Sequence, residues 1–267
     1  MRYRYITGKD YSHRKEWFSE RLALLAETFA IDICAYVIMS NHFHGVLKIN
    51  APVAQSWSDK KVTQQWEKLF KLPVLVERFL AGDCKSDAEL DKARETIQVF
   101  RERLMDISWF MRCLNEYIAR KANAEDKCTG RFWEGRFKSQ ALLDEQALIA
   151  CLTYVDLNPV RAGISDSLEN SEFTSIKQRI DQIQSKSKTP ESAPRKLADF
   201  IGSFRTKEGI PFALSDYDVY VYGYTSAMVA GSKRMALELT DWTGQVSEMI
   251  NEALLKQKRQ KFLSNWA

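Results

Sequence analysis

The chain has 267 residues, a formal net charge of +4 and 45% hydrophobic residues. This length and composition are typical of a globular protein with a full core, and they exclude an intrinsically disordered chain. The small positive charge permits nucleic acid as a partner but does not require it, because charged side chains usually face solvent. Five widely spaced cysteines indicate neither a disulfide framework nor a zinc knuckle. With no long apolar run, these features predict a cytoplasmic protein without membrane contact.

The first part of the chain predicts a strand, a helix and a hairpin. Residues 2–6 alternate like a short strand, and residues 12–30 carry apolar side chains at helical spacing. Two short apolar runs, residues 33–38 and 46–49, then predict two buried strands joined by a tight turn at Ser40-Asn41. Alternation along the second strand predicts one face with His42, His44, Val46 and Lys48, and another with Phe43, Leu47 and Ile49.

Two imidazoles side by side on a strand are candidate metal ligands. Histidine is the commonest ligand of transition metals, and His42 and His44 are two of only three histidines in the chain. A histidine on a strand is more often a structural residue, and a His-x-His pair occurs in many unrelated folds. The residues alone therefore leave a metal site and a structural role open.

The middle of the chain predicts helices. Residues 51–103 are polar and charged with helical patches, which indicates a helical insertion punctuated by Pro73 and Gly82-Asp83. Residues 107–123 carry a continuous apolar stripe, which is typical of a helix packed on the core.

Basic and aromatic residues interleave in residues 129–143. The pattern predicts an alternating strand from about Arg136, with Arg136, Lys138 and Gln140 on one face. Cations next to flat rings suit single-stranded nucleic acid, because they contact phosphates and stack on bases. A solvated strand face beside an aromatic residue that packs in the core explains the same pattern. Arg131 and Trp133 belong to this candidate DNA-binding group.

A helix is expected from Asp144, with Leu148, Leu152 and Val155 facing inward. Tyr154 and Asn158 lie four residues apart and share a side of this helix, off the inward stripe. Pro159 predicts that the helix ends at Asn158. After a further helix at residues 165–183, residues 184–196 are expected to be a linker and residues 197–267 a mostly helical C-terminal extension, with residues 1–183 forming the main domain.

Three motifs in this order resemble one family. They are Met39-Ser40-Asn41-His42-Phe43-His44, Gly130-Arg131-Phe132-Trp133, and the segment from Tyr154 through Asn158-Pro159-Val160-Arg161 to Gly163. The chain resembles the REP-associated tyrosine transposases, a branch of the single-tyrosine HUH transposases, over residues 10–164. One departure is that the segment before Tyr11 is short for the first strand of this family.

The resemblance implies an α+β fold, namely the HUH endonuclease core with a ferredoxin-like antiparallel sheet and helices on one face. It implies that Tyr154 is the nucleophile, that His42, His44 and Asn158 bind Mg²⁺ or Mn²⁺, and that the substrate is single-stranded DNA beside a hairpin. We place Arg161 with the expected DNA-binding residues. Such enzymes act as monomers or homodimers.

The expected activity is a metal-dependent endonuclease and strand transferase that forms a 5′-phosphotyrosine intermediate. Two alternatives remain open at this stage. One is a domesticated protein of the same fold that binds DNA without cleaving it, which the short N-terminal segment favours. The other is a His-x-His metallohydrolase that uses activated water in place of the tyrosine.

Overall fold

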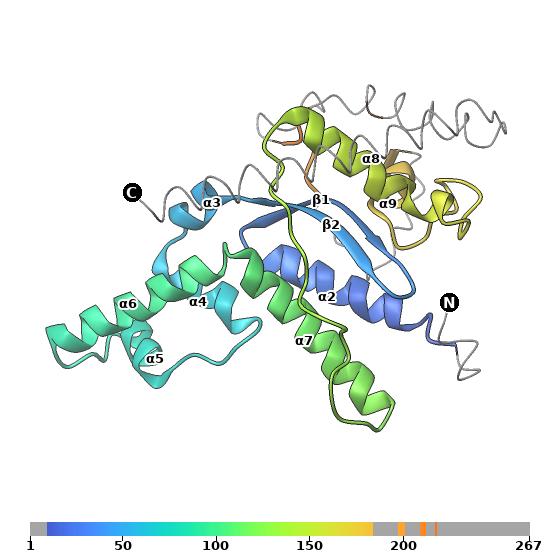
Figure 1. Cartoon of the computed structure of the whole chain (residues 1–267). Coiled ribbons are helices and arrows are strands. Elements are labelled where there is room, and N and C mark those ends of the chain that lie inside the picture. Colours follow the sequence, from blue (N-terminus) through green and yellow to red (C-terminus); the bar gives the residue numbers. More distant parts are fainter. Residues whose placement is uncertain (1–9, 184–196, 201–208, 212–216, 218–267) are drawn as a thin grey trace, which may run out of the picture.

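The computed structural model describes residues 10–183, 197–200, 209–211 and 217 of the chain. The strand expected at residues 2–6, the linker at 184–196 and nearly all of the C-terminal extension lie outside the described residues. The described part is an α+β structure with eight helices around a two-stranded antiparallel sheet (Figure 1). None of the described helices combines the length and apolarity needed to span a membrane.

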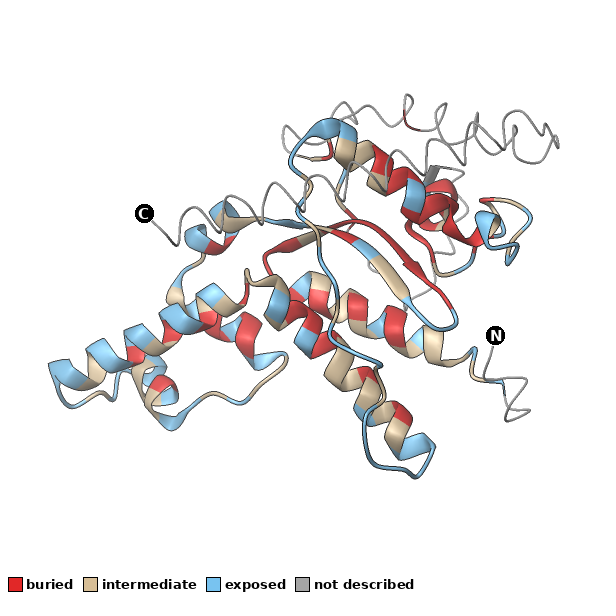
Figure 2. Cartoon of the chain, in the orientation of Figure 1, coloured by how far each residue is buried: buried red, intermediate tan, exposed pale blue. Residues whose placement is uncertain are grey.

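The predicted hairpin is confirmed. Strand β1 (Ile31–Ile38) pairs antiparallel with β2 (Phe43–Ile49), from Ile31 opposite Ile49 to Ile38 opposite Phe43. The register shifts between Ile33 and Ala35, where β1 carries one extra residue. Almost all of β1 is buried, whereas most of β2 is half-buried or exposed (Figure 2). An apolar run without alternation is typical of a strand that is covered on both faces.

Helices cover both faces of this sheet, so the expectation of helices on one face is wrong. Helices α2 (Arg14–Thr28) and α7 (Ile107–Glu125) lie on one side, and α8 (Glu145–Arg161) and α9 (Ser175–Ile183) on the other (Figure 1). Each side has its own apolar cluster, because β1 projects side chains in both directions. Phe18, Leu22 and Phe110 belong to the first cluster, and Leu152 and Val155 to the second.

Residues 51–103 are helical, as predicted. They form α3 (Ala51–Ser56), α4 (Asp59–Glu67), α5 (Val74–Ala81) and α6 (Asp87–Arg103). Ser58 and Ser86 cap α4 and α6 by accepting backbone hydrogen bonds. Trp66 of α4 stacks on Phe100 of α6, with ring centroids 4.2 Å apart. These helices therefore extend the first apolar cluster, to which both Trp66 and Phe100 belong.

The strand expected from Arg136 does not form. Residues 131–143 contain neither helix nor strand, although they run past β2 (Figure 1). Side chains hold the segment instead of a backbone ladder: the Trp133 indole donates to the Asn115 carbonyl at 2.9 Å, and Phe137 packs on the first cluster. An alternating pattern predicts a strand only when a neighbouring strand edge lies within hydrogen-bonding distance, and here a pocket separates the segment from β2.

Helix α8 starts where expected and ends later than expected. Asp144 caps it by accepting a hydrogen bond from the Ala147 amide at 2.7 Å. The predicted end at Asn158 is wrong, because the helix continues through Pro159 to Arg161. Proline removes one amide donor, but the next bonds form, such as that from the Ala162 amide to the Asn158 carbonyl at 3.0 Å. The helix ends before Gly163, whose φ of +63° suits glycine.

Candidate metal and tyrosine site

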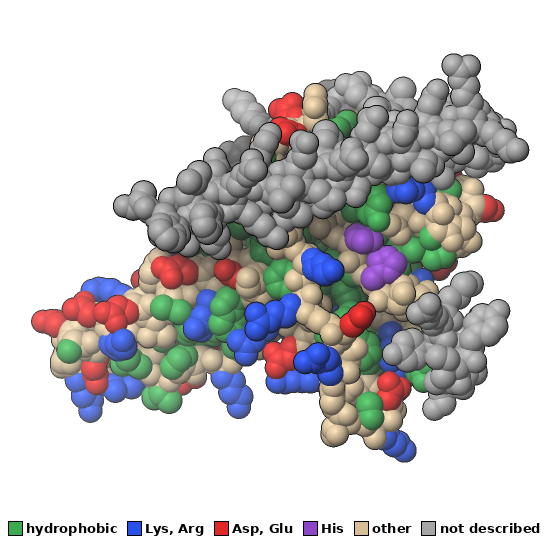
Figure 3. All heavy atoms as spheres, viewed as in Figure 1, with side chains coloured by type: hydrophobic (Ala, Val, Ile, Leu, Met, Phe, Trp, Pro, Cys, Tyr) green, Lys and Arg blue, Asp and Glu red, His purple; other side chains and the backbone are tan. Residues whose placement is uncertain are grey.

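His42 and His44 lie side by side at the start of β2. Their ring centroids are 4.8 Å apart at an angle of 76°. His44 sits in the ladder opposite Val37, and His42 stands just before the strand begins. The rigid hairpin therefore sets the direction of both rings. Figure 3 shows histidine side chains at the surface with lysine and arginine side chains nearby.

The surroundings keep both imidazoles neutral. Burial lowers the pKa of His42, and burial together with the neighbouring His42 lowers the pKa of His44. His42 Nδ1 lies 2.7 Å from the side-chain oxygen of Asn41. Because that oxygen can only accept, the ring proton sits on Nδ1 and the lone pair remains on Nε2. A neutral imidazole with an exposed lone pair is the form that binds a metal.

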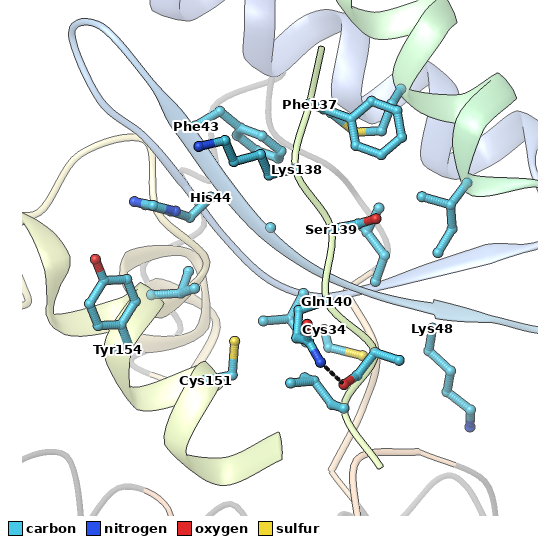
Figure 4. A pocket seen from close by; sticks show the side chains of 18 of the residues that line it. Cys34, Phe43, His44, Lys48, Phe137, Lys138, Ser139, Gln140, Cys151 and Tyr154 are labelled. Carbon is cyan, nitrogen blue, oxygen red and sulfur yellow. Dashed lines mark hydrogen bonds between the residues drawn. The ribbon is translucent and has the colours of Figure 1, made fainter. Parts of the chain in front are cut away.

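Tyr154 of α8 reaches His44. Its ring centroid is 5.5 Å from that of His44, and the two rings meet edge to face at 80°. Figure 4 shows Tyr154 projecting from α8 toward the His44 side of β2. The Tyr154 side chain is exposed, with 36% of its surface accessible. An exposed phenol beside His44 is open to a substrate.

Arg161 lies about two turns after Tyr154 on the same helix. Its guanidinium carbon is 5.2 Å from the centroid of the Tyr154 ring. The cation is thus close enough to attract both the aromatic face and any anion bound near the phenol.

Asn158 was predicted as the third ligand. It lies on α8 one turn after Tyr154 and is largely buried, with 9% of its surface accessible. Among the described residues, no cluster of three or more His, Cys, Asp or Glu side chains could hold a metal ion. The donor set at this place is therefore two neutral imidazoles, to which an amide oxygen, water or a phosphate oxygen would be added. Mixed nitrogen and oxygen ligands of this kind fit a divalent cation.

A pocket of about 1380 Å³ adjoins the site. The edge of β2 that faces away from β1 forms one wall, residues 133–145 form the opposite wall, and α7 and α8 contribute side chains from the two helical layers. Figure 4 shows His44 and Tyr154 toward one end, Gln140 in the middle and Lys48 toward the other end. Gln140 donates to the Ala141 carbonyl, while its side-chain oxygen is buried without a partner. The pocket lining thus combines apolar side chains with polar, basic and acidic ones.

The predicted DNA-binding residues divide between this pocket and its surroundings. Arg136 and Lys138 are exposed and line the pocket. Trp133 also lines it, but its indole is fixed against α7, which agrees with the packing alternative raised for this residue. Arg131 and Arg161 are exposed and lie outside the lining. Sequence patterns thus placed three of the five basic and aromatic candidates beside one cavity.

Comparisons with protein-family models, with curated proteins and with solved structures gave no match. The geometry and chemistry of these residues are therefore the basis for assigning a function.

Two residues, Asn41 and Asp156, were assigned no role from the sequence. Asn41 orients His42, and its position directly before the first histidine was the available signal. Asp156 is fully buried beneath Tyr154. It follows Leu152 by one helical turn, so an acid on the inward stripe of α8 was visible in the pattern.

Proposed function

We propose that this chain is a metal-dependent, single-stranded DNA endonuclease and strand transferase with Tyr154 as its nucleophile. The observation that carries the proposal is the 5.5 Å separation of the His44 and Tyr154 rings. Strand β2 and helix α8, which are far apart in the sequence, thereby bring a phenol to a neutral imidazole. The resemblance of the three motifs to REP-associated tyrosine transposases supports the same reading, with hairpin-forming repetitive palindromic DNA as the expected substrate.

His42, His44 and, by resemblance, Asn158 would hold the divalent cation, with Mg²⁺ or Mn²⁺ expected. Bound there, such a cation neutralises and polarises a phosphodiester. The Tyr154 oxygen attacks phosphorus, its proton passes to water, and the bond from phosphorus to the 3′ oxygen breaks. The 3′ oxygen takes a proton and leaves as a hydroxyl, while the 5′ phosphate stays on Tyr154. Attack by another 3′ hydroxyl reverses the step and joins strands.

The remaining side chains suit this substrate. Lys138, Arg136 and Arg161 surround the site with positive charge, which attracts the phosphate backbone of a single strand. Tyr154 is itself one of the residues that line the pocket. DNA bound along this face would therefore pass the phenol in contact with cations.

A ferredoxin-like sheet also belongs to the proposal. A two-stranded sheet is marginal by itself, and the pocket along the edge of β2 that faces away from β1 lies between the two helical layers, where a further strand would pair with β2. Phe18 near the start of α2 packs on Phe43 at the hairpin end, with ring centroids 4.8 Å apart. A strand that leads into α2 would thus run antiparallel to β2. Protection of every β2 amide from hydrogen exchange would support a further strand at this edge.

The deciding experiment incubates the full chain with a labelled single-stranded hairpin oligonucleotide and Mn²⁺, followed by a denaturing gel. We expect a covalent protein–DNA band that Tyr154→Phe abolishes. Tyr117→Phe is the matched control, because Tyr117 lies on α7 against Arg21 and Lys121. DNA binding without any adduct would favour the non-cleaving DNA-binding protein. Cleavage that survives Tyr154→Phe would favour a metallohydrolase.

A further inference from the structure

Beneath the exposed Tyr154, helix α8 carries a fully buried acid. Asp156 follows Tyr154 by two residues, so it points to the opposite side of the helix. None of its surface is accessible. One carboxyl oxygen accepts a hydrogen bond from the Ser175 hydroxyl at 2.7 Å, and the other accepts from the Tyr217 hydroxyl at 2.6 Å. The acid is therefore held from two directions.

These partners extend to the strand that pairs with the histidine strand. The Ser175 hydroxyl accepts a hydrogen bond from the Tyr36 amide of β1 at 2.9 Å. Tyr36 stands next to Val37, the residue opposite His44 in the ladder. Asp156 and Ser175 thus link the back of the tyrosine helix to the backbone adjacent to the His44 position.

Tyr217 brings part of the C-terminal region into the same core. Its side chain is fully buried and packs on Phe200, with ring centroids 5.1 Å apart. Nearby, the Ala198 amide donates to the Ile33 carbonyl of β1 at 2.8 Å. Arg179 of α9 donates to the Cys34 and Ala198 carbonyls at 2.8 and 3.0 Å. The described residues between 197 and 217 therefore pack on both β1 and α8.

We propose that Asp156 and Tyr217 are positioning residues, whose hydrogen bond fixes the rotation of α8 and so places Tyr154 beside His44. This inference rests on the proposed function of Tyr154. A phenol oxygen about 8 Å from the helix axis moves by about 3 Å when the helix turns by roughly 20°. Apolar packing tolerates a small rotation, whereas a hydrogen bond to a buried carboxyl is directional. The C-terminal region would thereby control the approach of the nucleophile.

The test uses Tyr217→Phe, which removes one hydroxyl and retains the ring that packs on Phe200. The full chain is labelled with 3-fluorotyrosine, and its ¹⁹F NMR signal for Tyr154 is assigned from Tyr154→Phe. We expect Tyr217→Phe to shift or broaden the Tyr154 signal, whereas Tyr117→Phe leaves it unchanged. Ser175→Ala removes the other donor to Asp156 and should perturb the same signal, which provides a second variant if the first does not fold.

Nicking kinetics complete the test. We expect the rate of adduct formation to fall by about ten- to a hundredfold in Tyr217→Phe, with an unchanged KM for the oligonucleotide. A merely structural role would lower the folded fraction without moving the Tyr154 signal of the folded protein. An unchanged signal and rate in both variants would overturn the proposal. A shifted signal in a protein that forms no adduct even as wild type would refute the proposed function and leave the positioning role standing.

Discussion

The rings of His44 and Tyr154 meet edge to face with centroids 5.5 Å apart, although 110 residues separate them in the chain. Strand β2 supplies one ring and helix α8 the other. Val46, two residues after His44, packs in the same apolar cluster as Val155, which directly follows Tyr154. Packing of Val46 and Val155 therefore holds β2 and α8 together at this point. This packing brings the two rings into contact although the Tyr154 ring is exposed to solvent.

Removing either strand histidine should weaken metal binding. We expect His42→Ala and His44→Ala each to lower the affinity for Mn²⁺ by roughly tenfold or more, because each deletes one of two imidazole ligands. Titration calorimetry or the EPR signal of free Mn²⁺ measures this. His13→Ala is the control, since His13 pairs with Glu125 at 2.6 Å on the α2 and α7 side. Equal affinity in all three variants would show that the ion binds elsewhere.

Arg161→Gln should slow adduct formation while DNA binding persists. The guanidinium lies 5.2 Å from the centroid of the Tyr154 ring, and a cation in this position is worth about 0.5–2 kcal/mol, which corresponds to a rate decrease of about two- to thirtyfold. Single-turnover nicking provides the measurement. Arg120→Gln is the control, because Arg120 is an exposed helical arginine on α7 paired with Glu116. A slow step in both variants would point to a general loss of positive charge.

Gly45→Ala should destabilise the hairpin. A Cβ at Gly45 would lie 2.8 Å from the tip of the Phe43 ring, and that ring is packed against Phe18. Forcing the ring to move should cost about 1–3 kcal/mol in the free energy of unfolding, measured by urea denaturation. Gly135→Ala is the control, since a Cβ at Gly135 meets no atom within 4 Å. If the two variants are equally stable, the Phe43 ring has room that the structure does not show.

Asp156 should make stability depend on pH. Burial raises the pKa of its carboxyl, although Arg179 and the hydrogen bonds from Ser175 and Tyr217 act in the opposite direction. The folded protein then keeps a proton that the unfolded chain releases near pH 3.9. The stability linked to this proton is complete below about pH 3.9 and is lost as the pH rises through the folded-state pKa.

The corresponding experiment measures the free energy of unfolding of wild type and Asp156→Asn between pH 4 and pH 8. We expect the advantage of wild type over Asp156→Asn to shrink as the pH rises, by about 1.4 kcal/mol for each tenfold difference in proton affinity between the folded and unfolded states. An advantage that grows with pH would instead show that Arg179 stabilises the ionised carboxylate.

Local patterns in the sequence were sufficient for the elements whose structure depends on their own spacing. The hairpin at Ser40-Asn41, the helix α2 and the helical character of residues 51–103 were all predicted and are confirmed. Each is specified by apolar spacing and by turn or cap residues close in sequence. The motifs also directed attention to His42, His44 and Tyr154 before any of their distances were known.

Tertiary structure decided the features that depend on distant partners. Residues 136–143 alternate like a strand, but a pocket lies between them and β2, so they do not pair with that strand. Helix α8 continues through Pro159, which is buried, and the backbone hydrogen bonds of the residues after it still form. The sequence around Asp156 does not distinguish it from a solvent-exposed helical acid. Its burial and its hydrogen bonds come from Ser175 of α9 and from Tyr217. Spacing along the chain determines which face a side chain occupies, whereas its partner, its burial and its pKa depend on segments that only the fold brings together.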